Sequence, residues 1–361
     1  MKKVFPVFVI LLLTACAPRY TINYDYPKEP ISFPRDEAAH YSAQTEWWYY
    51  TGHIFDEDNN EYGFELTFFK RITSDDKSPL LRFPAYWIKD VGMVAHFAIT
   101  DVKGENFEYG QKTNLSSKWK AKEDHYEVSI GSWSAAEKDG VYQLKAGMKG
   151  YEIDLNLKPV KKPVPNGPGG IMAKGGGNGN YYYSITRIEV TGTLKAGGKT
   201  HKVHGISWMD HEYGTMKVAP GRKGWDWFSL QLNDGTDIMI YMIRDKNQVV
   251  RESGGTIVNA SGDYKWITFS DIEIKDLSTW HSDKTGADYP SQWEVNIRPL
   301  DLKLSLIPVI KDQELRLAPI DYWEGAVNIT GQMSDAPVLG KGYVELVGYS
   351  KIKRPGMPNL R

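Results

Sequence analysis

The densest group of titratable side chains in this sequence is Asp210-His211-Glu212, which follows Trp208 and precedes a Tyr-Gly turn. On a β-strand, Asp210 and Glu212 point to one face of the sheet and His211 points to the other. Apolar aromatic surroundings raise the pKa of a carboxylic acid. Asp210 or Glu212 could therefore act as a general acid that protonates an alkene or a leaving group near neutral pH.

Carboxylates next to tryptophans recur along the chain. Asp226 precedes Trp227, and Glu324 follows Trp323. Such residues could line a ligand cavity, in which the ring faces of Trp208 and Trp227 stabilise a developing cation by about 0.5 to 2 kcal/mol. The candidate catalytic residues are Asp210, His211, Glu212 and Asp226, and the candidate ligand-binding residues are Trp47, Trp48, Trp208, Trp227, Tyr241, Trp323 and Glu324.

The same residues also allow other interpretations. A buried hydrogen-bonding network at strand ends would explain residues 210–212 without any chemistry, and carboxylates could simply accept bonds from indole N–H groups. His201, His204 and His211 match no zinc-ligand spacing, so we expect no metal and no cofactor. Residues 205–209 only approach the G-x-S-x-G motif of serine hydrolases, and no strand-to-helix turn follows them.

The elements that must position these side chains are β-strands. Apolar and polar residues alternate with a period of two over 62–68, 126–130 and 151–157, which is typical of half-buried strands. Asp139-Gly140 and Lys149-Gly150 supply tight turns between such strands. We expect no helix of three or more turns in the mature chain.

A weak internal repeat divides the chain. An aromatic strand, a polar turn and an apolar strand occur at 48–69 and again at 227–243, which predicts two related β-domains with a junction near 196–200. Residues 238–243 are apolar on both faces, so one face could pack between domains and the other could line a pocket. The glycine-rich segment 166–180 leads into a strand and is not a phosphate-binding loop.

The N-terminus has the features of a bacterial export signal. Lys2 and Lys3 precede an apolar run that ends in small residues before Cys16, and this run is too short to span a bilayer. Residues 13–16 resemble a lipobox, whose cysteine carries diacylglycerol after the peptide before it is removed. We therefore expect lipidation of Cys16, the only cysteine, and an outer-membrane anchor facing the periplasm, because Ala17 and not Asp follows it.

Composition limits the class of protein further. The formal net charge of −1 becomes −1 − 2 = −3 once Lys2 and Lys3 are removed, and no long run of like charge exists, so nucleic acid is not an expected partner. Aromatic residues make up 13% of the chain, which suits strands, cavity linings or sugar-binding surfaces more than helical bundles. Residues 16–39 contain four prolines among polar groups and should form an extended tether after the signal peptide at 1–15.

Six motifs in order carry a resemblance to a known family: EWWYYTGH at 46–53, YYSITR at 182–187, WMDHEYG at 208–214, GWDWF at 224–228, YWEG at 322–325 and GYVEL at 342–346. From about 41 to 349 the chain resembles the AttH and hydroxyneurosporene synthase family. The resemblance implies an all-β fold of two lipocalin-like domains, here at 40–196 and 197–361. It also implies relatives that include carotenoid 1,2-hydratases, more distant fungal cyclisation catalysts and exported proteins of unassigned role, and it does not fix a reaction.

Three classes of function follow. The first is a membrane-anchored exported lipoprotein that binds an apolar or amphipathic small molecule in a barrel cavity. The second is a hydratase-, isomerase- or hydrolase-type enzyme that uses a carboxylic acid in an aromatic pocket. The third is a carbohydrate-directed protein, which would expose its tryptophans on the surface. The expected partners are the small molecule and, through the lipid anchor, the membrane; an export or ABC-transport system is a further candidate.

Overall fold

The computed structural model describes residues 29–72, 91–114, 117–172, 179–215, 221–317 and 320–352. Cys16 and the predicted signal peptide lie outside these described residues. Most of the described chain is β-strand, and its only helical pieces are the short 3₁₀ turns η1 (Arg35–Glu37), η3 (Pro168–Gly170), η4 (Phe269–Asp271) and η5 (Arg298–Leu300). No helix in the described ranges is long and apolar enough to cross a membrane.

The first sheet contains thirteen of the described strands, with the main order β4-β3-β2-β1-β13-β12-β9-β8-β7-β6-β5 and with β10 and β11 paired to β12. The strands are β1 (Thr45–Phe55), β2 (Glu61–Ile72), β3 (Val91–Asp101), β4 (Asn106–Thr113), β5 (Trp119–Ala121), β6 (Glu127–Ile130), β7 (Trp133–Lys138), β8 (Val141–Met148), β9 (Tyr151–Pro159), β10 (Val164–Pro165), β11 (Ile171–Met172), β12 (Asn180–Ala196) and β13 (Lys199–Gly214).

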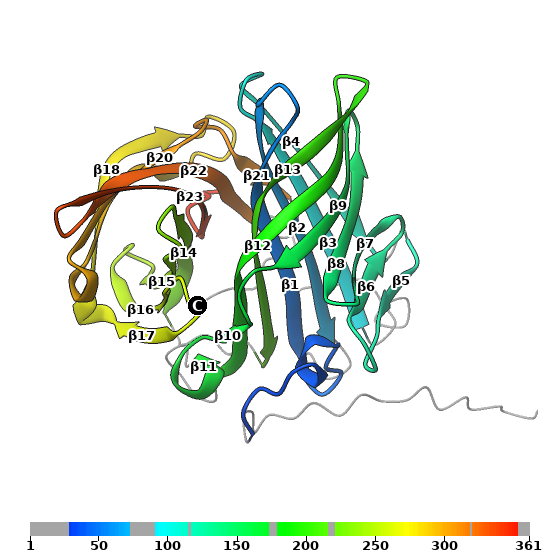
Figure 1. Cartoon of the computed structure of the whole chain (residues 1–361), viewed down its shortest axis with the longest axis horizontal. Helices are drawn as coiled ribbons and strands as arrows, with labels where there is room; N and C mark the ends of the chain where they lie inside the picture. Colours follow the sequence, from blue (N-terminus) through cyan, green and yellow to red (C-terminus); the bar gives the residue numbers. More distant parts are fainter. Residues whose placement is uncertain are drawn as a thin grey trace, which may run out of the picture.

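The second sheet contains ten described strands, in the order β17-β16-β15-β14-β23-β22-β20-β19-β18 with β21 paired to β22. The strands are β14 (Arg222–Leu232), β15 (Asp237–Asp245), β16 (Val250–Val258), β17 (Tyr264–Thr268), β18 (Ile272–His281), β19 (Asp288–Ile297), β20 (Leu302–Pro308), β21 (Glu314–Arg316), β22 (Asp321–Met333) and β23 (Ala336–Val347). Both sheets are antiparallel and curl on themselves side by side (Figure 1). The predicted all-β fold of two lipocalin-like domains is confirmed.

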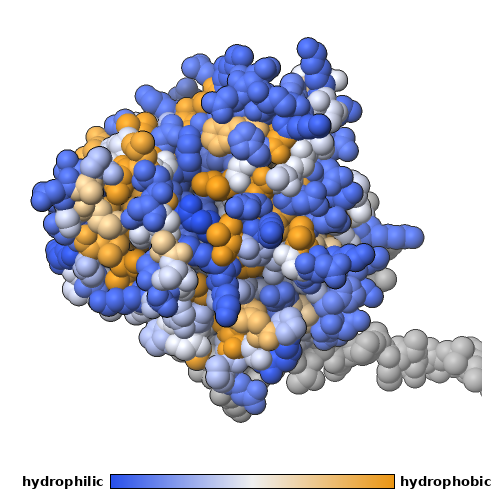
Figure 2. Space-filling model, in the orientation of Figure 1, coloured by the Kyte–Doolittle hydropathy of each residue, from blue (hydrophilic) through white to orange (hydrophobic). Residues whose placement is uncertain are grey.

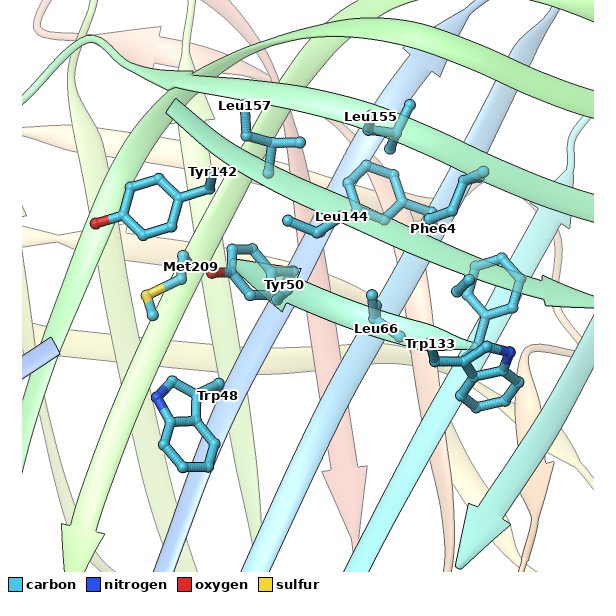
Figure 3. Close-up of a cluster of buried hydrophobic side chains, with 14 of the residues drawn as sticks. Trp48, Tyr50, Phe64, Leu66, Trp133, Tyr142, Leu144, Leu155, Leu157 and Met209 are labelled. Carbon is cyan, nitrogen blue, oxygen red and sulfur yellow. The ribbon is translucent and has the colours of Figure 1, made fainter. Parts of the chain in front are cut away.

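Large side chains fill the inside of the first curled sheet. The residues that meet there come from the inward faces of six strands: β1, β2, β7, β8, β9 and β13. Figure 3 labels Trp48, Phe64, Trp133, Leu155 and Met209 among them. All five are buried, because the period-two alternation places every second side chain of each strand on this face. The region drawn in Figure 3 is therefore a packed core.

The two sheets divide later in the chain than the sequence indicated. β13 pairs with β1 from Thr45 opposite Gly214 to Phe55 opposite His204, so it belongs to the first sheet. Gly197 and Gly198, both at positive φ, form the hairpin turn between β12 and β13. The junction expected near 196–200 is thus a turn inside the first sheet, and the second sheet begins at β14.

The last part of the segment expected to be a tether packs on the first domain. Asp36, Ala38 and Ala39 are buried, and the backbone N–H of Ala39 donates to the carbonyl of Lys122 over 2.8 Å. Small apolar residues beside a short 3₁₀ turn allow this close approach. Residues 29–39 therefore form part of the folded body.

Both hairpins of the internal repeat exist. β1 pairs with β2, and β14 pairs with β15. The two apolar faces of β15 separate as predicted: Ile238 and Ile240 lie in the core of the second domain, whereas Met239 and Tyr241 lie in a cluster between the two domains. The sheet faces that pack against each other thus position the candidate site.

Candidate functional site

The candidate site lies between the two sheets. The outer faces of β1, β2, β12 and β13 pack against β14, β15, β22 and β23, and a buried aromatic cluster joins them. Asp210 lies opposite Tyr49 on β1 and opposite Ser184 on β12, so these side chains share the face that meets the second domain. Figure 2 shows apolar side chains among polar ones where the two halves of the molecule meet.

Asp210 is buried and accepts three hydrogen bonds. Ser184 Oγ and Trp208 Nε1 donate to Oδ1 over 2.5 and 2.7 Å, and the Tyr182 hydroxyl donates to Oδ2 over 2.5 Å. Trp227 Nε1 donates to the Tyr182 oxygen over 2.9 Å, which links the second domain to this group. Burial raises the pKa of Asp210 to about 7, although the three donors oppose the rise. Asp210 can therefore exist in either protonation state near neutral pH.

Aromatic rings surround this acid in two layers. Inside, the Trp227 ring meets the rings of Tyr49 and Trp208 edge to face, with centroids 5.2 and 6.1 Å apart. Nearer the surface, four partly buried aromatic side chains pack against the same cluster: Trp47, Trp225, Tyr241 and Trp266. We call these four side chains the aromatic rim. Glu212 is buried on the same face and accepts a bond from Asn180 Nδ2 over 2.8 Å.

A second acidic group lies deeper between the sheets. The Tyr49 hydroxyl donates to Glu324 Oε1 over 2.6 Å, and Thr67 Oγ1 donates to Glu65 Oε1. Burial raises the pKa of Glu65 to about 8, and the charge of Glu345 adds to the rise. Burial, followed by the charges of Glu345 and Glu65, also raises the pKa of Glu324 well above its usual value.

Glu65 and Tyr49 are site residues that the sequence did not predict. Glu65 occupies a polar position of the alternation at 62–68, a position that normally faces water. The second sheet covers this face, so Glu65 is fully buried. A face that is polar in the sequence but meets another domain gives no local signal of its burial.

His211 lies on the opposite face of β13, inside the first domain. Its Nε2 lies 2.9 Å from Glu46 Oε1, and its Nδ1 lies 3.1 Å from the Tyr183 hydroxyl. Lys70 Nζ pairs with Glu46 Oε2 over 2.8 Å, and both side chains are fully buried. Burial opposes ionisation of Glu46, but the charges of Lys70 and His40 hold its pKa well below the usual value.

The ligand atoms of His40, Glu46 and His211 lie within 4.8 Å of one another, which is close enough for a metal ion. Their surroundings do not suit one. The Lys70 ammonium already supplies the positive charge beside Glu46, and Glu46 Oε1 lies within 2.9 Å of a ring nitrogen of both histidines. We interpret this group as a structural ion-pair network in the first domain.

The other predicted residues lie in the domain cores. Trp48 is in the core of the first domain and Trp323 in that of the second. Asp226 pairs with Arg244 over 2.9 Å on the inner side of the second sheet. Burial raises the pKa of Asp226 to about 6 despite this pair. The structure thus brings Asp210, Glu212, Trp47, Trp208, Trp227, Tyr241 and Glu324 together between the domains, and it places His211, Asp226, Trp48 and Trp323 elsewhere.

Together these features define a two-domain lipocalin-like β-protein with a buried acidic and aromatic layer between its domains. The chain belongs to the AttH-like family, whose model matches residues 24–349. It is similar to the crystal structure of an AttH protein from Nitrosomonas europaea, with a TM-score of 0.80 and 29% identity over 90% of this chain and 98% of that one. This match confirms the predicted family resemblance.

Two further relatives carry the names of enzymes. Kievitone hydratase from Nectria haematococca shares the fold with a TM-score of 0.70 and 15% identity over 92% of this chain and 97% of that one. Dehydratase asqC from Emericella nidulans is 23% identical over 69% of this chain and 75% of its own length. At this level of identity, the match to kievitone hydratase shows that the two proteins share a fold.

Proposed function

We propose that this protein is a lyase that adds water to, or removes water from, an apolar or amphipathic small molecule between its two domains. The observation that carries the proposal is the environment of Asp210: a buried carboxyl group with a pKa near 7, surrounded by tryptophan and tyrosine rings. A relative named as a dehydratase and a fold shared with a hydratase point to the same reaction class.

In this proposal Asp210 handles the proton on carbon. In the direction of hydration, the protonated acid gives its proton to one alkene carbon, and the positive charge develops on the other carbon. The π-faces of Trp208 and Trp227 would stabilise that charge in a water-poor site. In dehydration the Asp210 carboxylate takes the same proton back.

The aromatic rim supports an apolar or amphipathic substrate. Its four side chains are only partly buried, whereas the rings around Asp210 are buried. A ligand that covers the rim would remove apolar surface from water, which is the main driving force for binding such molecules. No tryptophan among the described residues is fully exposed, so the exposed platforms expected of a carbohydrate-directed protein have no support here.

Isotope incorporation tests the proposal without knowledge of the substrate. Purified protein is incubated with an envelope lipid extract in H₂¹⁸O, and the extract is then searched by mass spectrometry for molecules that have gained or exchanged solvent oxygen. We expect wild-type protein to label at least one species and Asp210→Asn to lower the rate by about 10²- to 10⁴-fold. Absence of labelling by the wild type, or equal labelling by a folded Asp210→Asn variant, would exclude it.

We also propose that Cys16 carries the membrane anchor and that the rim lies near it. Glu29 exchanges hydrogen bonds with the Tyr181 hydroxyl, and the preceding residue, Asn180, binds Glu212 from the other face of the strand. Glu212 lies opposite Trp47 of the rim. The described body thus begins at the end of β12 and β13 that carries Trp47 on its other face, and an anchor there would favour a substrate taken from the membrane.

The variant Cys16→Ser tests the anchor, because Cys16 is the only cysteine. We expect the variant to lose metabolic labelling with fatty acid and to leave the membrane fraction. Unchanged labelling and unchanged fractionation would contradict the proposal.

A further inference from the structure

Three buried oxygen atoms between the domains lack a hydrogen-bond partner: Thr51 Oγ1, Glu65 Oε2 and Glu324 Oε2. Only five such side-chain atoms occur in the described part of the chain, so three in one layer are a marked concentration. An unsatisfied buried polar atom costs about 1 to 3 kcal/mol. Such atoms therefore call for a ligand or a bound water.

These three side chains are neighbours. Thr51 and Glu65 lie directly opposite each other on β1 and β2, on the face that meets the second domain. Tyr49, two residues before Thr51, donates to Glu324 from across the interface. Glu65 and Glu324 are also close enough for the charge of Glu65 to raise the pKa of Glu324.

The existing hydrogen bonds leave one oxygen of each acid without a partner among the protein groups. The partnered oxygen is Oε1 in both cases, since Tyr49 donates to Glu324 and Thr67 donates to Glu65. While these hydroxyl groups donate to Oε1, a neutral form of either acid can carry its proton on the unpartnered Oε2. The acid hydroxyls of Glu65 and Glu324 and the hydroxyl of Thr51 are thus available to bind one small oxygen-bearing group.

We propose that Thr51, Glu65 and Glu324 form an oxygen site that holds the hydroxyl group leaving in dehydration and the water added in hydration, with Glu324 as the residue that transfers its proton. This inference rests on the proposed function and adds to it. It assigns Glu324 as a second catalytic residue and gives Thr51 and Glu65 the role of positioning the oxygen.

Two carboxyl groups, those of Glu324 and Asp210, account for every proton that moves in the reaction. In dehydration the carbon–oxygen bond breaks, its electron pair stays on oxygen, and Glu324 Oε2 supplies the proton that makes this oxygen water. The Asp210 carboxylate takes the proton from the neighbouring carbon, and the electrons of that carbon–hydrogen bond form the double bond. Hydration is the reverse. A proton returns from Asp210 to Glu324 after each dehydration, and from Glu324 to Asp210 after each hydration.

Asp210 and Glu324 lie in different environments, which suit Asp210 to act as the base and Glu324 as the acid in dehydration. Burial raises the pKa of Asp210 to about 7 but raises that of Glu324 well above its usual value, and the charge of Asp210 contributes to the second shift. An ionised Asp210 therefore keeps the proton on Glu324. Separated pKa values in one site are how two carboxyl groups acquire the roles of acid and base.

Two measurements on the resting protein test the oxygen site directly. In infrared spectra at pH 7, we expect Glu324→Gln to remove a band of a neutral carboxyl group that wild type shows. The control Glu314→Gln changes an equally buried acid that accepts bonds from Ser282, Thr285 and Tyr289, and it should leave that band in place. If the spectrum of Glu324→Gln keeps every neutral-carboxyl band of wild type, the proposal is overturned.

A high-resolution crystal structure is the second measurement. We expect a water within hydrogen-bond distance of Glu324 Oε2 and of at least one of the other two oxygens in wild type, and its loss in Thr51→Val. The control Thr256→Val removes a buried hydroxyl that donates to Asn166 and should keep the water. If the three oxygens bond only to protein groups, the inference is wrong.

The lipid-extract assay in H₂¹⁸O then separates this inference from the proposed function. We expect Glu324→Gln to lower labelling by about 10²-fold or more, and Thr51→Val by about tenfold, while both keep the thermal midpoint of wild type. If wild type labels nothing, the proposed function fails, and the infrared and crystallographic results still decide the oxygen site. If a folded Glu324→Gln variant labels as well as wild type, the proposed function stands and the role of Glu324 is refuted.

Discussion

Asp210 and His211 are consecutive residues of β13, yet they belong to two different buried regions. His211 faces the core of the first domain, where Glu46 lies beside Lys70 and two histidines. Asp210 faces the second domain, where burial, followed by the charges of Glu345 and Glu65, raises the pKa of Glu324, and burial together with the charge of Glu345 raises that of Glu65. No salt bridge joins Asp210, Glu65 or Glu324 to a lysine or arginine among the described residues.

The difference separates a structural network from a reactive one. A buried ion pair whose hydrogen bonds are satisfied holds its groups in one charge state, because any change of protonation leaves a charge without its partner. Buried carboxyl groups that lack a counter-ion can change their protonation state near neutral pH. The first region therefore stabilises the fold, and the second can adopt the protonation states that the proposed reaction needs.

The largest expected effect is on the first region. Lys70→Met keeps the aliphatic stem but leaves Glu46 buried without its cation. We expect the free energy of unfolding, measured by urea denaturation, to fall by about 3 to 5 kcal/mol.

The matched control is Lys145→Met, which breaks an exposed pair with Asp154 of nearly the same length, 2.9 Å. It should cost less than about 1 kcal/mol, because solvent screens an exposed pair. Equal losses in the two variants would contradict the structural role of the Glu46–Lys70 pair.

Trp47 and Trp48 provide a second test, since they are adjacent on β1 and lie on opposite faces. Trp48 packs inside the first domain with 1% of its surface exposed, so Trp48→Ala should lower the free energy of unfolding by about 3 to 5 kcal/mol. Trp47 belongs to the partly buried rim. We expect Trp47→Ala to cost less stability and to weaken the binding of a fatty acid or isoprenoid probe about tenfold in fluorescence titration.

If Trp48→Ala weakens probe binding as strongly as Trp47→Ala while remaining folded, the site is not confined to the interdomain face. The same result would move the proposed ligand into the first domain. Equal stability losses in the two variants would instead show that the rim is as tightly packed as the core.

The sequence predicted the fold because period-two alternation and Gly-containing turns act locally. For that reason the sequence predicted the hairpins of β1 with β2 and of β14 with β15. Alternation also showed that Asp210 and Glu212 share a face that His211 does not. The domain junction was misplaced because a Gly-Gly hairpin turn at 197–198 has the same composition as a linker.

The candidate site was only partly predictable. Asp210, Trp208 and Trp227 were indicated because acids and indoles are dense in their motifs. Glu65 and Tyr49 acquire their role only when the second sheet covers the outer face of the first, and no alternation pattern distinguishes such a face from one that meets water. The order of strands within a sheet and the packing of the two sheets come from contacts between residues far apart in the chain.

The smallest expected effect at each step of the measurement is a change in stability of at most about 1.4 kcal/mol per pH unit, and it distinguishes the two regions by sign. The pKa of Asp210 is raised in the folded state to about 7. The folded protein thus holds a proton that the unfolded chain has lost, and wild-type stability falls as pH rises from about 4 to about 7. Asp210→Asn cannot ionise, so its stability relative to wild type should rise over this window by at most about 1.4 kcal/mol per pH unit and level off above pH 7.

Glu46→Gln should behave in the opposite way. The pKa of Glu46 is lowered in the folded state, mainly by Lys70 and against the effect of burial. The stabilisation it gives is present above the pKa of an unfolded glutamate, about 4.3, and is lost as the pH falls below that value. Wild type should therefore exceed Glu46→Gln in stability at neutral pH, and this difference in stability should disappear in acid.

Urea denaturation of all three proteins at half-unit steps from pH 3 to pH 8 measures both slopes. Parallel curves for the two variants would mean that Asp210 and Glu46 are held in the same charge state, and the interdomain layer would then have no special capacity to exchange protons.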